Sequence, residues 1–519
     1  MAQNSLERVT SNKLGELEPH GKALESLGQT AGHDAVFQAQ ATMINQAIED
    51  IGMGKYQWTL FGLAGYGWLC DQLWESSVSN ALPEIANEFQ PRRSGFLIVA
   101  LMVGLILGAS FWGLGCDLIG RRWAWNLSLL FACVFGLVAA GSNSWVTCCS
   151  LIALSGFGIG GNLPVDGTVF LEFLPGTHQY LLEILTVWWA AGQFIAAFAS
   201  WGLLSHYSCS SDTPAGECRK ADNMGWRYLF ILMGGLTMIG FCVRFFVFRL
   251  YESPKYLVSL GKYEEAIDVL NKVAKYNGVT QSLTVEHLRA AEQNAESTDH
   301  RREHFKRAVA HLGPRGWNNI RVLWSTKKLA LSFALVMLLW GMIGMANPIY
   351  NSLLPIYLQI HGAESGDSST GTTYRNLLVT IVCSIPGTLL GGYLIGMKRI
   401  GRKGTLGFSL LLTGAFLFAF TTARTQGTIL AFNCIISFTQ YIMWGALYYY
   451  TPEVFPTFHR GTAVGLAASF NRVCGLAGTL ITTYSGFTNV PLFLGASLWM
   501  AAGLLSFVLP FETRNKASL

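Results

Sequence analysis

The sequence predicts an all-α membrane protein that crosses the bilayer many times, and three observations support this. Hydrophobic residues make up 51% of the 519 residues. Only 13% of the residues are charged, about half the share found in soluble domains. The apolar residues form runs of roughly 20, the length of a membrane-spanning helix. A soluble enzyme, a disordered hub and a nucleic-acid-binding protein are disfavoured, because such a surface requires lipid as its solvent.

Polar segments divide the chain. The first is mixed in charge and lacks the basic-then-apolar pattern of a cleaved signal peptide. A long charged stretch separates two apolar blocks, each long enough for about six spans. We therefore expect a cytoplasmic N-terminal segment, a six-helix bundle, a cytoplasmic helical linker, a second six-helix bundle and a short tail, at 1–56, 57–248, 249–327, 328–510 and 511–519.

The spans must be helices rather than strands, because the apolar runs are long, unbroken and not alternating. The twelve expected spans are 57–82, 94–116, 123–141, 145–172, 182–204, 226–248, 328–357, 375–397, 404–422, 428–450, 461–484 and 488–510. With the N-terminus inside, Lys and Arg are in excess on the cytoplasmic side. We therefore expect both termini in the cytoplasm, and the plasma membrane rather than an internal one.

Most of the 11 cysteines sit in or beside apolar spans, where Cys behaves as a small hydrophobe. Cys209 and Cys218 instead lie in a polar loop on the outside, where a disulfide and two free thiols are both open. The cysteine spacings are not those of a zinc site. We expect neither a metal nor a cofactor.

Two local patterns recur at one fixed offset of 281 residues. Gly-Arg-Arg at 120–122 returns as Gly-Arg-Lys at 401–403. Glu-x-x-Pro-x-x-His begins at Glu172 and again at Glu453. A shared offset in two unrelated patterns indicates that the six-helix halves are duplicates. That is the architecture of carriers in which two bundles rock about a site at mid-membrane.

Several motifs carry a family resemblance. Gly-Leu-Gly-Cys-Asp-Leu-Ile-Gly-Arg-Arg at 113–122 resembles the loop signature of the major facilitator superfamily. Glu-Ser-Pro-Lys-Tyr-Leu at 252–257 and Phe-Glu-Thr-Arg at 511–514 resemble motifs of its sugar-porter branch. Gly-Phe-Gly-Ile-Gly-Gly-Asn-Leu-Pro at 156–164 looks most like the subgroup of synaptic-vesicle-like proteins and bacterial niacin carriers, including fungal members. The resemblance covers residues 50–515 and implies the major facilitator fold.

The chain also departs from the family pattern. Lys398 stands in the second loop motif where the first has Asp117, and Gln179 stands where an Arg is expected. Trp340-Gly-Met-Ile-Gly-Met-Ala-Asn347 occupies the place of the paired glutamines of hexose carriers. Without those amide groups to hold sugar hydroxyls, a hexose substrate is disfavoured.

The resemblance implies a gate of charged residues at the cytoplasmic ends of the spans. In the family, similar residues join the two halves when the carrier opens outward. One exposed pair contributes only about 0–1 kcal/mol, but several together bias the two states. The expected gating residues are Asp117, Arg121, Arg122, Glu172, Glu252, Arg402, Glu453, Arg460 and Glu512.

Charged residues within the spans are costly and need a reason. Asp71 and Glu75 lie one helical turn apart in the first span. Asp71 suits the uptake and release of a proton, and the alternative is a structural acid bonded within the bundle. Glu75 lies nearer the outside mouth. Asp166 follows Pro164, and either serves transport or satisfies backbone groups at an irregular turn.

Arg472 is the only cation that we expect deep in the bilayer. It either neutralises an anionic substrate or pairs with a carboxylate such as Asp71. Gln193, Trp340 and Asn347 complete the expected substrate and coupling set. Most Trp residues of membrane proteins are interfacial anchors, but Trp340 at mid-span suits stacking on a flat solute.

We therefore expect a secondary active transporter, not an enzyme, that moves a small organic solute by alternating access, driven by protons. An aromatic or pyridine-carboxylate acid is favoured by Arg472. One alternative is the symport of a sugar or another neutral solute with a proton. A second alternative is a non-transporting sensor on the same fold, although such proteins usually add a long signalling tail and this chain ends soon after Pro510. The expected partners are the solute, protons and lipid, with no nucleic acid, and the protein is expected to be a monomer.

Overall fold

The computed structural model describes residues 35–178, 181–209, 218–293, 324, 327–352, 354, 370–397, 400–423, 425–455, 460–485 and 488–510. These residues contain helices and no strand, which confirms the predicted all-α fold class. The chain divides into two compact units. The small unit comprises Met1–Gly52 and Ser253–Asn318, and the large unit comprises Met53–Glu252 and Asn319–Leu519. The N-terminal segment and the linker therefore belong to one unit, although the sequence separates them.

The small unit consists of α3 (Ala35–Ile51), α11 (Pro254–Ser259), α12 (Tyr263–Asn277) and α13 (Val285–Gln293). The apolar residues of α12 recur at helical spacing and are buried, as expected of an amphipathic helix. Gln40 of α3 donates a hydrogen bond to the carbonyl oxygen of Leu288 at 2.9 Å. Gly278 ends α12 in the left-handed conformation, with φ at +77°, which favours glycine at this position.

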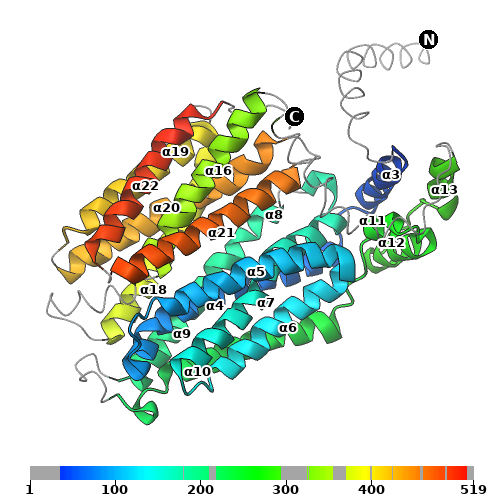
Figure 1. The fold of residues 1–519 in the computed structure, drawn as a ribbon. Coiled ribbons are helices and arrows are strands. Elements are labelled where there is room, and N and C mark those ends of the chain that lie inside the picture. Colours follow the sequence, from blue (N-terminus) through cyan, green and yellow to red (C-terminus); the bar gives the residue numbers. More distant parts are fainter. Residues whose placement is uncertain are drawn as a thin grey trace. The chain divides into compact units, whose positions relative to one another are not determined.

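The first half of the large unit is a bundle that we call the N bundle (Figure 1, blue to green). Its long helices are α4 (Lys55–Phe89), α5 (Phe96–Ile119), α6 (Arg121–Ala139), α7 (Trp145–Phe173), α9 (Thr186–Tyr207) and α10 (Gly225–Cys242). A π-helical turn, η3 (Val243–Val247), continues α10. Three short helices lie in the connections: η1 (Gly176–His178), α8 (Leu181–Ile184) and η2 (Lys220–Asp222).

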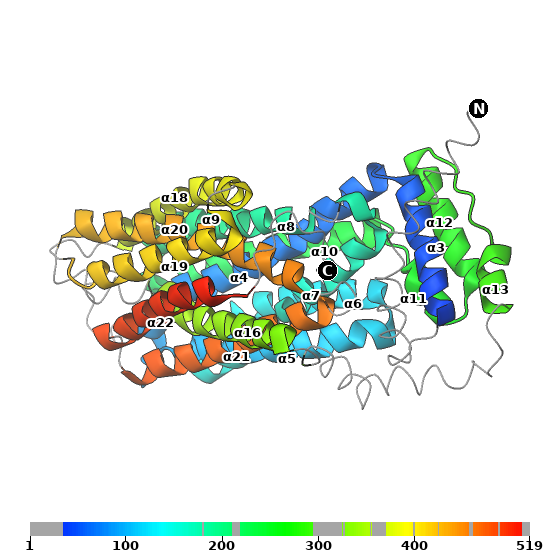
Figure 2. The same cartoon turned by 90° about the horizontal axis from the view of Figure 1, so that it is seen from above.

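The second half of the large unit, the C bundle, runs from yellow-green to red in Figures 1 and 2. Its helices are α16 (Lys327–Asn347), α18 (Thr370–Gly396), α19 (Gly401–Phe420), α20 (Gln426–Val454), α21 (Arg460–Ser485) and α22 (Asn489–Val508), with a π-helical turn η4 (Pro348–Ser352) after α16. Among the described residues, 11 helices are long and apolar enough to cross a membrane. The 35-residue α4, which carries Asp71 and Glu75, is a further long helix. Together they give the twelve long helices that the sequence predicts.

Glycines allow α5 and α7 to pack closely. A Cβ atom on Gly104 or Gly108 would lie 2.1 Å or 2.0 Å from a backbone carbonyl oxygen of α7. A Cβ atom on Gly160 of α7 would likewise lie 2.3 Å from the carbonyl oxygen of Leu105. The glycine-rich run in the fourth span is therefore a helix-packing surface, as small residues usually are in membranes.

The two bundles differ in their buried polar contacts. The N bundle holds ion pairs: Arg244 with Asp166 at 2.8 Å and Arg227 with Glu88 at 2.6 Å. In the described part of the C bundle, the fully buried contacts are between neutral groups, and its ion pair of Arg402 with Glu453 is only partly buried. Trp340 donates from its indole nitrogen to Thr451 at 2.9 Å, Tyr350 donates to Asn433 at 2.5 Å, and Thr413 donates to Thr439 at 2.8 Å.

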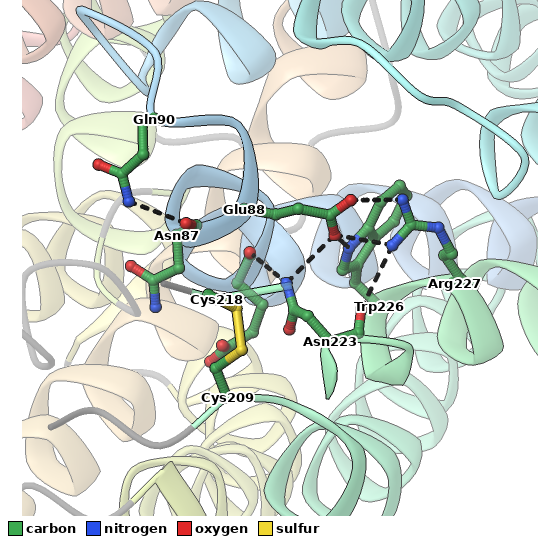
Figure 3. The surroundings of a disulfide bond; sticks show 9 residues. Asn87, Glu88, Gln90, Cys209, Cys218, Asn223, Trp226 and Arg227 are labelled. Atoms are coloured by element: carbon green, nitrogen blue, oxygen red, sulfur yellow. Dashed lines mark hydrogen bonds and ion pairs between the residues drawn. A yellow bond between two sulfur atoms is a disulfide. The ribbon is translucent and has the colours of Figure 1, made fainter. Parts of the chain in front are cut away.

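The loop between α9 and α10 carries a disulfide between Cys209 and Cys218, so we call this end of the large unit the disulfide end (Figure 3). Beside it, both oxygens of Glu88 accept hydrogen bonds from Arg227, at 2.6 and 2.7 Å. The indole nitrogen of Trp226 donates to the same carboxylate at 2.9 Å. These contacts fasten the end of α4 to the start of α10.

The two bundles contact each other at the disulfide end. The hydroxyl of Tyr374, on α18, donates to the carbonyl oxygen of Asn80, on α4, at 2.8 Å. The guanidinium of Arg93 lies 4.3 Å from the centre of the Tyr484 ring of α21. We call the opposite end, where α5 leads into α6, the Arg121 end.

Candidate substrate and coupling site

The two carboxylates predicted in the first span lie on α4 and bind amide groups. Asp71 is 4% exposed and accepts a hydrogen bond from Asn162 of α7 at 3.1 Å. Glu75 accepts one from Gln72 at 3.3 Å. An amide neutralises no charge, so both acids sit among neutral partners in an apolar bundle. Such groups are suited to exchanging a proton.

Arg472 extends from α21 of the C bundle to the N bundle. Its guanidinium donates to the carbonyl oxygen of Gly160, on α7, at 3.4 Å. Its charge also acts electrostatically on Asp71 and Glu75. Among the described residues, no direct ion pair joins it to either acid, so the sequence-based alternative of an Arg472–Asp71 pair is not what the structure shows. The cation and the two acids nevertheless share one electrostatic environment.

Aromatic rings from both bundles form a continuous group beside these charges. Trp68 of α4 stacks on Trp189 of α9, with ring centres 5.1 Å apart. Trp189 meets Tyr448 of α20 edge-to-face at 5.3 Å, and Tyr448 meets Trp340 at 5.0 Å. The indole nitrogens of Trp68 and Trp189 are buried without a hydrogen-bond partner in the described part of the chain. Each could donate to an acceptor on a bound solute.

The remaining predicted residues bind within this region in different ways. Gln193 of α9 donates to Gln72 at 3.1 Å and accepts from Tyr441 of α20. Asn347 accepts from Gln440 at 2.8 Å. Trp340 uses its indole N–H on Thr451 inside the C bundle, so its ring face and edge are what it can offer to a solute. Gln193, like Arg472, therefore bonds across the two bundles.

Asp166 lies one turn beyond Asn162 on α7 and acts electrostatically on Asp71, but its own partner is Arg244. Both side chains are fully buried, and two hydrogen bonds of 2.8 and 3.1 Å join them. Arg244 also donates to the carbonyl oxygen of Leu63 at 2.6 Å and lies 4.3 Å from the centre of the Trp125 ring. In addition to Arg472, the spans thus hold the cation Arg244, which is fully buried at the end of its span. The charge on Arg244 is compensated by a partner from another helix.

The expected gating residues form ion pairs within each bundle. Arg121 pairs with Glu172 at 2.6 Å in the N bundle, and its backbone N–H donates to Glu252 at 3.0 Å. Arg402 pairs with Glu453 at 2.6 Å in the C bundle. The backbone N–H of Arg122 donates to the carboxylate of Glu252 at 3.4 Å. The side chains of Asp117, Arg460 and Glu512, and the residues Lys398 and Gln179, lie outside what the structure describes.

Sequence reasoning missed several partners in and around this site. Arg244 stands near the end of an apolar run, and the cost of a charge there was a usable signal that it needs an acid. Gln72 and Tyr441 carried no such signal, because neutral polar side chains are common in spans. The pair of Glu88 and Arg227 was also missed, since each looks like an ordinary residue at a span boundary.

Two helical bundles joined around charged and aromatic side chains are the arrangement of polytopic carriers built from two repeated halves. A family model described as the Major Facilitator Superfamily matches residues 67–479. The chain belongs to this superfamily, whose members are transporters rather than enzymes, and it is an integral, multi-pass membrane protein. The resemblance inferred from its motifs is thereby confirmed.

The relatives carry different substrate names. The chain is 46% identical to "MFS siderochrome iron transporter 1" of Ceriporiopsis subvermispora, over 94% of this chain and 93% of that protein. It is 26% identical to "Niacin transporter NiaP" of Acinetobacter baylyi, over 90% and 97%. It is also 26% identical to the "Synaptic vesicle 2-related protein" of Bos taurus, over 91% and 82%. The fungal, niacin-carrier and vesicular groups named by the motifs are all represented.

Solved structures confirm the fold. The partially occluded, inward-open xylose transporter XylE from E. coli superposes with a TM-score of 0.65, covering 89% of this chain and 99% of that chain. The two sequences are only 14% identical. The likeness therefore concerns the arrangement of helices and not the substrate.

Proposed function

We propose that this transporter is a secondary active carrier of a small organic acid, coupled to protons, and that Arg472 binds the acid group. The observation that carries the proposal is the position of Arg472: it is a C-bundle cation that reaches the N bundle without a direct ion-pair partner among the described residues. Its guanidinium can make two parallel hydrogen bonds to a carboxylate. The neighbouring indole rings favour a flat, aromatic acid.

Asp71 and Glu75 are the proposed proton carriers. Both lie on α4, and both feel the charge of Arg472. A bound anion at Arg472 would compete with these acids for the same positive charge. Substrate and proton would then bind together, because protonation of an acid removes the repulsion between it and the anion. We further propose that both termini are cytoplasmic, that the protein acts as a monomer, and that it resides in the plasma membrane.

The test is uptake by purified protein in liposomes, with labelled nicotinate as the probe and nicotinamide as its uncharged counterpart. Arg472→Lys should weaken nicotinate binding by about 1.5–3 kcal/mol, because Lys cannot reproduce the bidentate contact. Inhibition by nicotinamide should change far less. The matched control is Arg375→Lys at an exposed position of α18; this variant should bind nicotinate as the wild type does. Equal weakening for the acid and the amide would contradict a role of Arg472 in binding the carboxylate.

The coupling role of Asp71 has a separate test. Asp71→Asn keeps the shape of the side chain and its bond to Asn162, but it cannot exchange a proton. Accumulation driven by an imposed pH gradient should disappear, while exchange of labelled for unlabelled nicotinate should persist. Accumulation that still follows the gradient would rule out Asp71 as the proton carrier.

A second candidate substrate is an iron-loaded siderochrome, as in the name of the relative with 46% identity. A sugar or another neutral solute remains the third candidate. Competition of an iron-loaded siderochrome and of xylose against nicotinate uptake ranks the three. If only the siderochrome is taken up, the organic-acid proposal falls and the iron complex takes its place. No uptake of any of them would favour the sensor alternative.

A further inference from the structure

A line of hydrogen bonds runs from Glu75 in the N bundle to Tyr441 in the C bundle. Gln72 donates to Glu75 at 3.3 Å, and Gln193 donates to Gln72 at 3.1 Å. Tyr441 then donates its hydroxyl proton to Gln193. The line crosses three helices, α4, α9 and α20, and its last bond joins the two bundles.

All the bonds in this line point in one direction, and the carboxylate sets that direction. An ionised carboxylate can only accept hydrogen bonds, so Gln72 must present its NH₂ group to Glu75. Its carbonyl oxygen is then available to Gln193, whose own carbonyl oxygen is available to Tyr441. The orientation of the Gln72 amide thus determines that of the Gln193 amide. Successive hydrogen bonds in such a line also strengthen one another.

We infer that Gln72, Gln193 and Tyr441 are positioning residues that make the contact between the two bundles depend on the protonation of Glu75. This inference rests on the proposed proton coupling. It adds the residues through which protonation of Glu75 would alter the contact between the two bundles. When Glu75 is ionised, the line of hydrogen bonds favours the bond from Tyr441 to Gln193. When Glu75 binds a proton, the bond from Gln72 is no longer charge-assisted, and the donor-to-acceptor direction of the line is no longer fixed.

Ser384, on α18 of the same bundle, also interacts with the Tyr441 side chain. The Ser384 hydroxyl donates its proton to the carbonyl oxygen of Ile381 at 2.7 Å, so its oxygen can act as a second acceptor for Tyr441. The tyrosine can therefore leave Gln193 without leaving its own hydroxyl unpaired, which would be costly in a buried site. Two alternative partners, one in each bundle, are what a two-state contact requires.

The other charges around Glu75 are compatible with this role. Asp71 lies on the same helix and repels the ionised form, whereas Arg472 of α21 attracts it. Among the described residues, Tyr448 of α20 also interacts with Glu75. On the other elements packed against α4, Asp166 and Arg244 are paired with each other. Glu75 is therefore the charged end of the line.

The direction of the effect follows from the contacts at the disulfide end. In the observed conformation the bundles touch there, through Tyr374 and Asn80, and the Tyr441–Gln193 bond is present. Loss of that bond should favour the conformation in which the bundles part at the disulfide end. Acidification should thus open this end even without substrate.

The experiment measures the distance between the bundles in the full-length protein in lipid nanodiscs. Fluorescent labels on unnatural amino acids at Val146 and Val490 suit this purpose, because both side chains are strongly exposed (72% and 67%). They begin α7 and α22 at the disulfide end. The wild type should shift to longer distances as the pH falls. An absence of any pH-dependent shift would overturn the inference.

The decisive comparison is a double-mutant cycle. At high pH, Tyr441→Phe should raise the long-distance population about two- to tenfold, the effect of one hydrogen bond. In a Glu75→Gln background, Tyr441→Phe should change the long-distance population by less than about twofold, because a neutral residue 75 no longer fixes the direction of the hydrogen bonds. Equal effects in both backgrounds would overturn the inference.

Two further variants separate the line from general packing. Gln193→Leu interrupts it at the middle, and should reproduce the pH profile of Tyr441→Phe. Tyr350→Phe removes a buried hydroxyl that bonds to Asn433 inside the C bundle, and should keep the wild-type profile. A changed profile in Tyr350→Phe would assign the effect to loss of packing. Because no substrate is added, failure of nicotinate uptake and failure of this line are distinguishable.

Discussion

Replacing Arg244 by methionine tests whether the buried ion pair of the N bundle stabilises the fold or serves transport. Methionine keeps an unbranched apolar stem and removes the guanidinium with its charge. The change leaves Asp166, which is fully buried, without its two hydrogen bonds to the guanidinium. It also removes the bond to Leu63 and the contact with the Trp125 ring.

Removing one partner of a buried ion pair lowers the free energy of unfolding by about 3–5 kcal/mol, because the other charge remains buried without compensation. Both partners are 0% exposed, so the full range applies to Arg244→Met. Replacing Asp166 by leucine in the same chain removes that charge. The double variant should recover most of the lost stability, since a well-packed apolar pair is often as stable as an ion pair.

The assay is the free energy of unfolding of the full-length protein in mixed micelles, titrated with a denaturing detergent. Lys220→Met is the matched control. Lys220 is an exposed cation of the N bundle that binds only Asn143 among the described residues, and its loss should change stability by less than about 0.5 kcal/mol. A cost below about 1 kcal/mol for Arg244→Met, or a double variant as unstable as both singles together, would refute the reasoning. A stable double variant that no longer transports nicotinate would return Asp166 to a role in transport.

Two further predictions concern close contacts. Gly67→Ala places a Cβ atom 1.7 Å from the Asp166 carboxylate and should lower the free energy of unfolding by about 1–3 kcal/mol. The control, Gly62→Ala on the same helix, places a Cβ atom with nothing within 4 Å and should be neutral or stabilising. Equal effects at both sites would contradict the packing argument. Arg402→Ala removes the ion pair with Glu453 at the end of α20 and should lower stability by about 1–2 kcal/mol. Arg122→Ala keeps the backbone N–H that donates to Glu252, so its stability should change little. Thermal unfolding of both variants measures the difference.

The fold could be predicted from the sequence because the signals for it are local. The length of each apolar run and the share of charged residues together require helices in lipid. The offset of 281 residues shared by the Gly-Arg and the Glu-x-x-Pro patterns then indicates two equivalent halves. What the sequence did not show is that α3 belongs with α11, α12 and α13 in one unit, because that association joins segments far apart in the chain.

The site could be predicted only in part. Asp71 and Arg472 stand out because a charge in a span is costly, and the structure brings both to one region. Their partners do not stand out. Asn162 and Gln72 are neutral amides whose significance depends on which helix faces which. Arg244 is visible in the sequence as a charge near the end of a span, but only the ion pair in the structure shows that it is the partner of Asp166.

The difference in buried contacts between the bundles bears on how such chains can evolve. A neutral pair such as Tyr350 and Asn433 can lose one member at a cost of about 1–3 kcal/mol, so the C bundle can more easily accept changes one at a time. In the N bundle, losing either Arg244 or Asp166 alone costs more, about 3–5 kcal/mol, and the two are expected to change together. Descendants of one ancestral chain should therefore vary more freely inside the C bundle, and new substrate preferences have their easier route there.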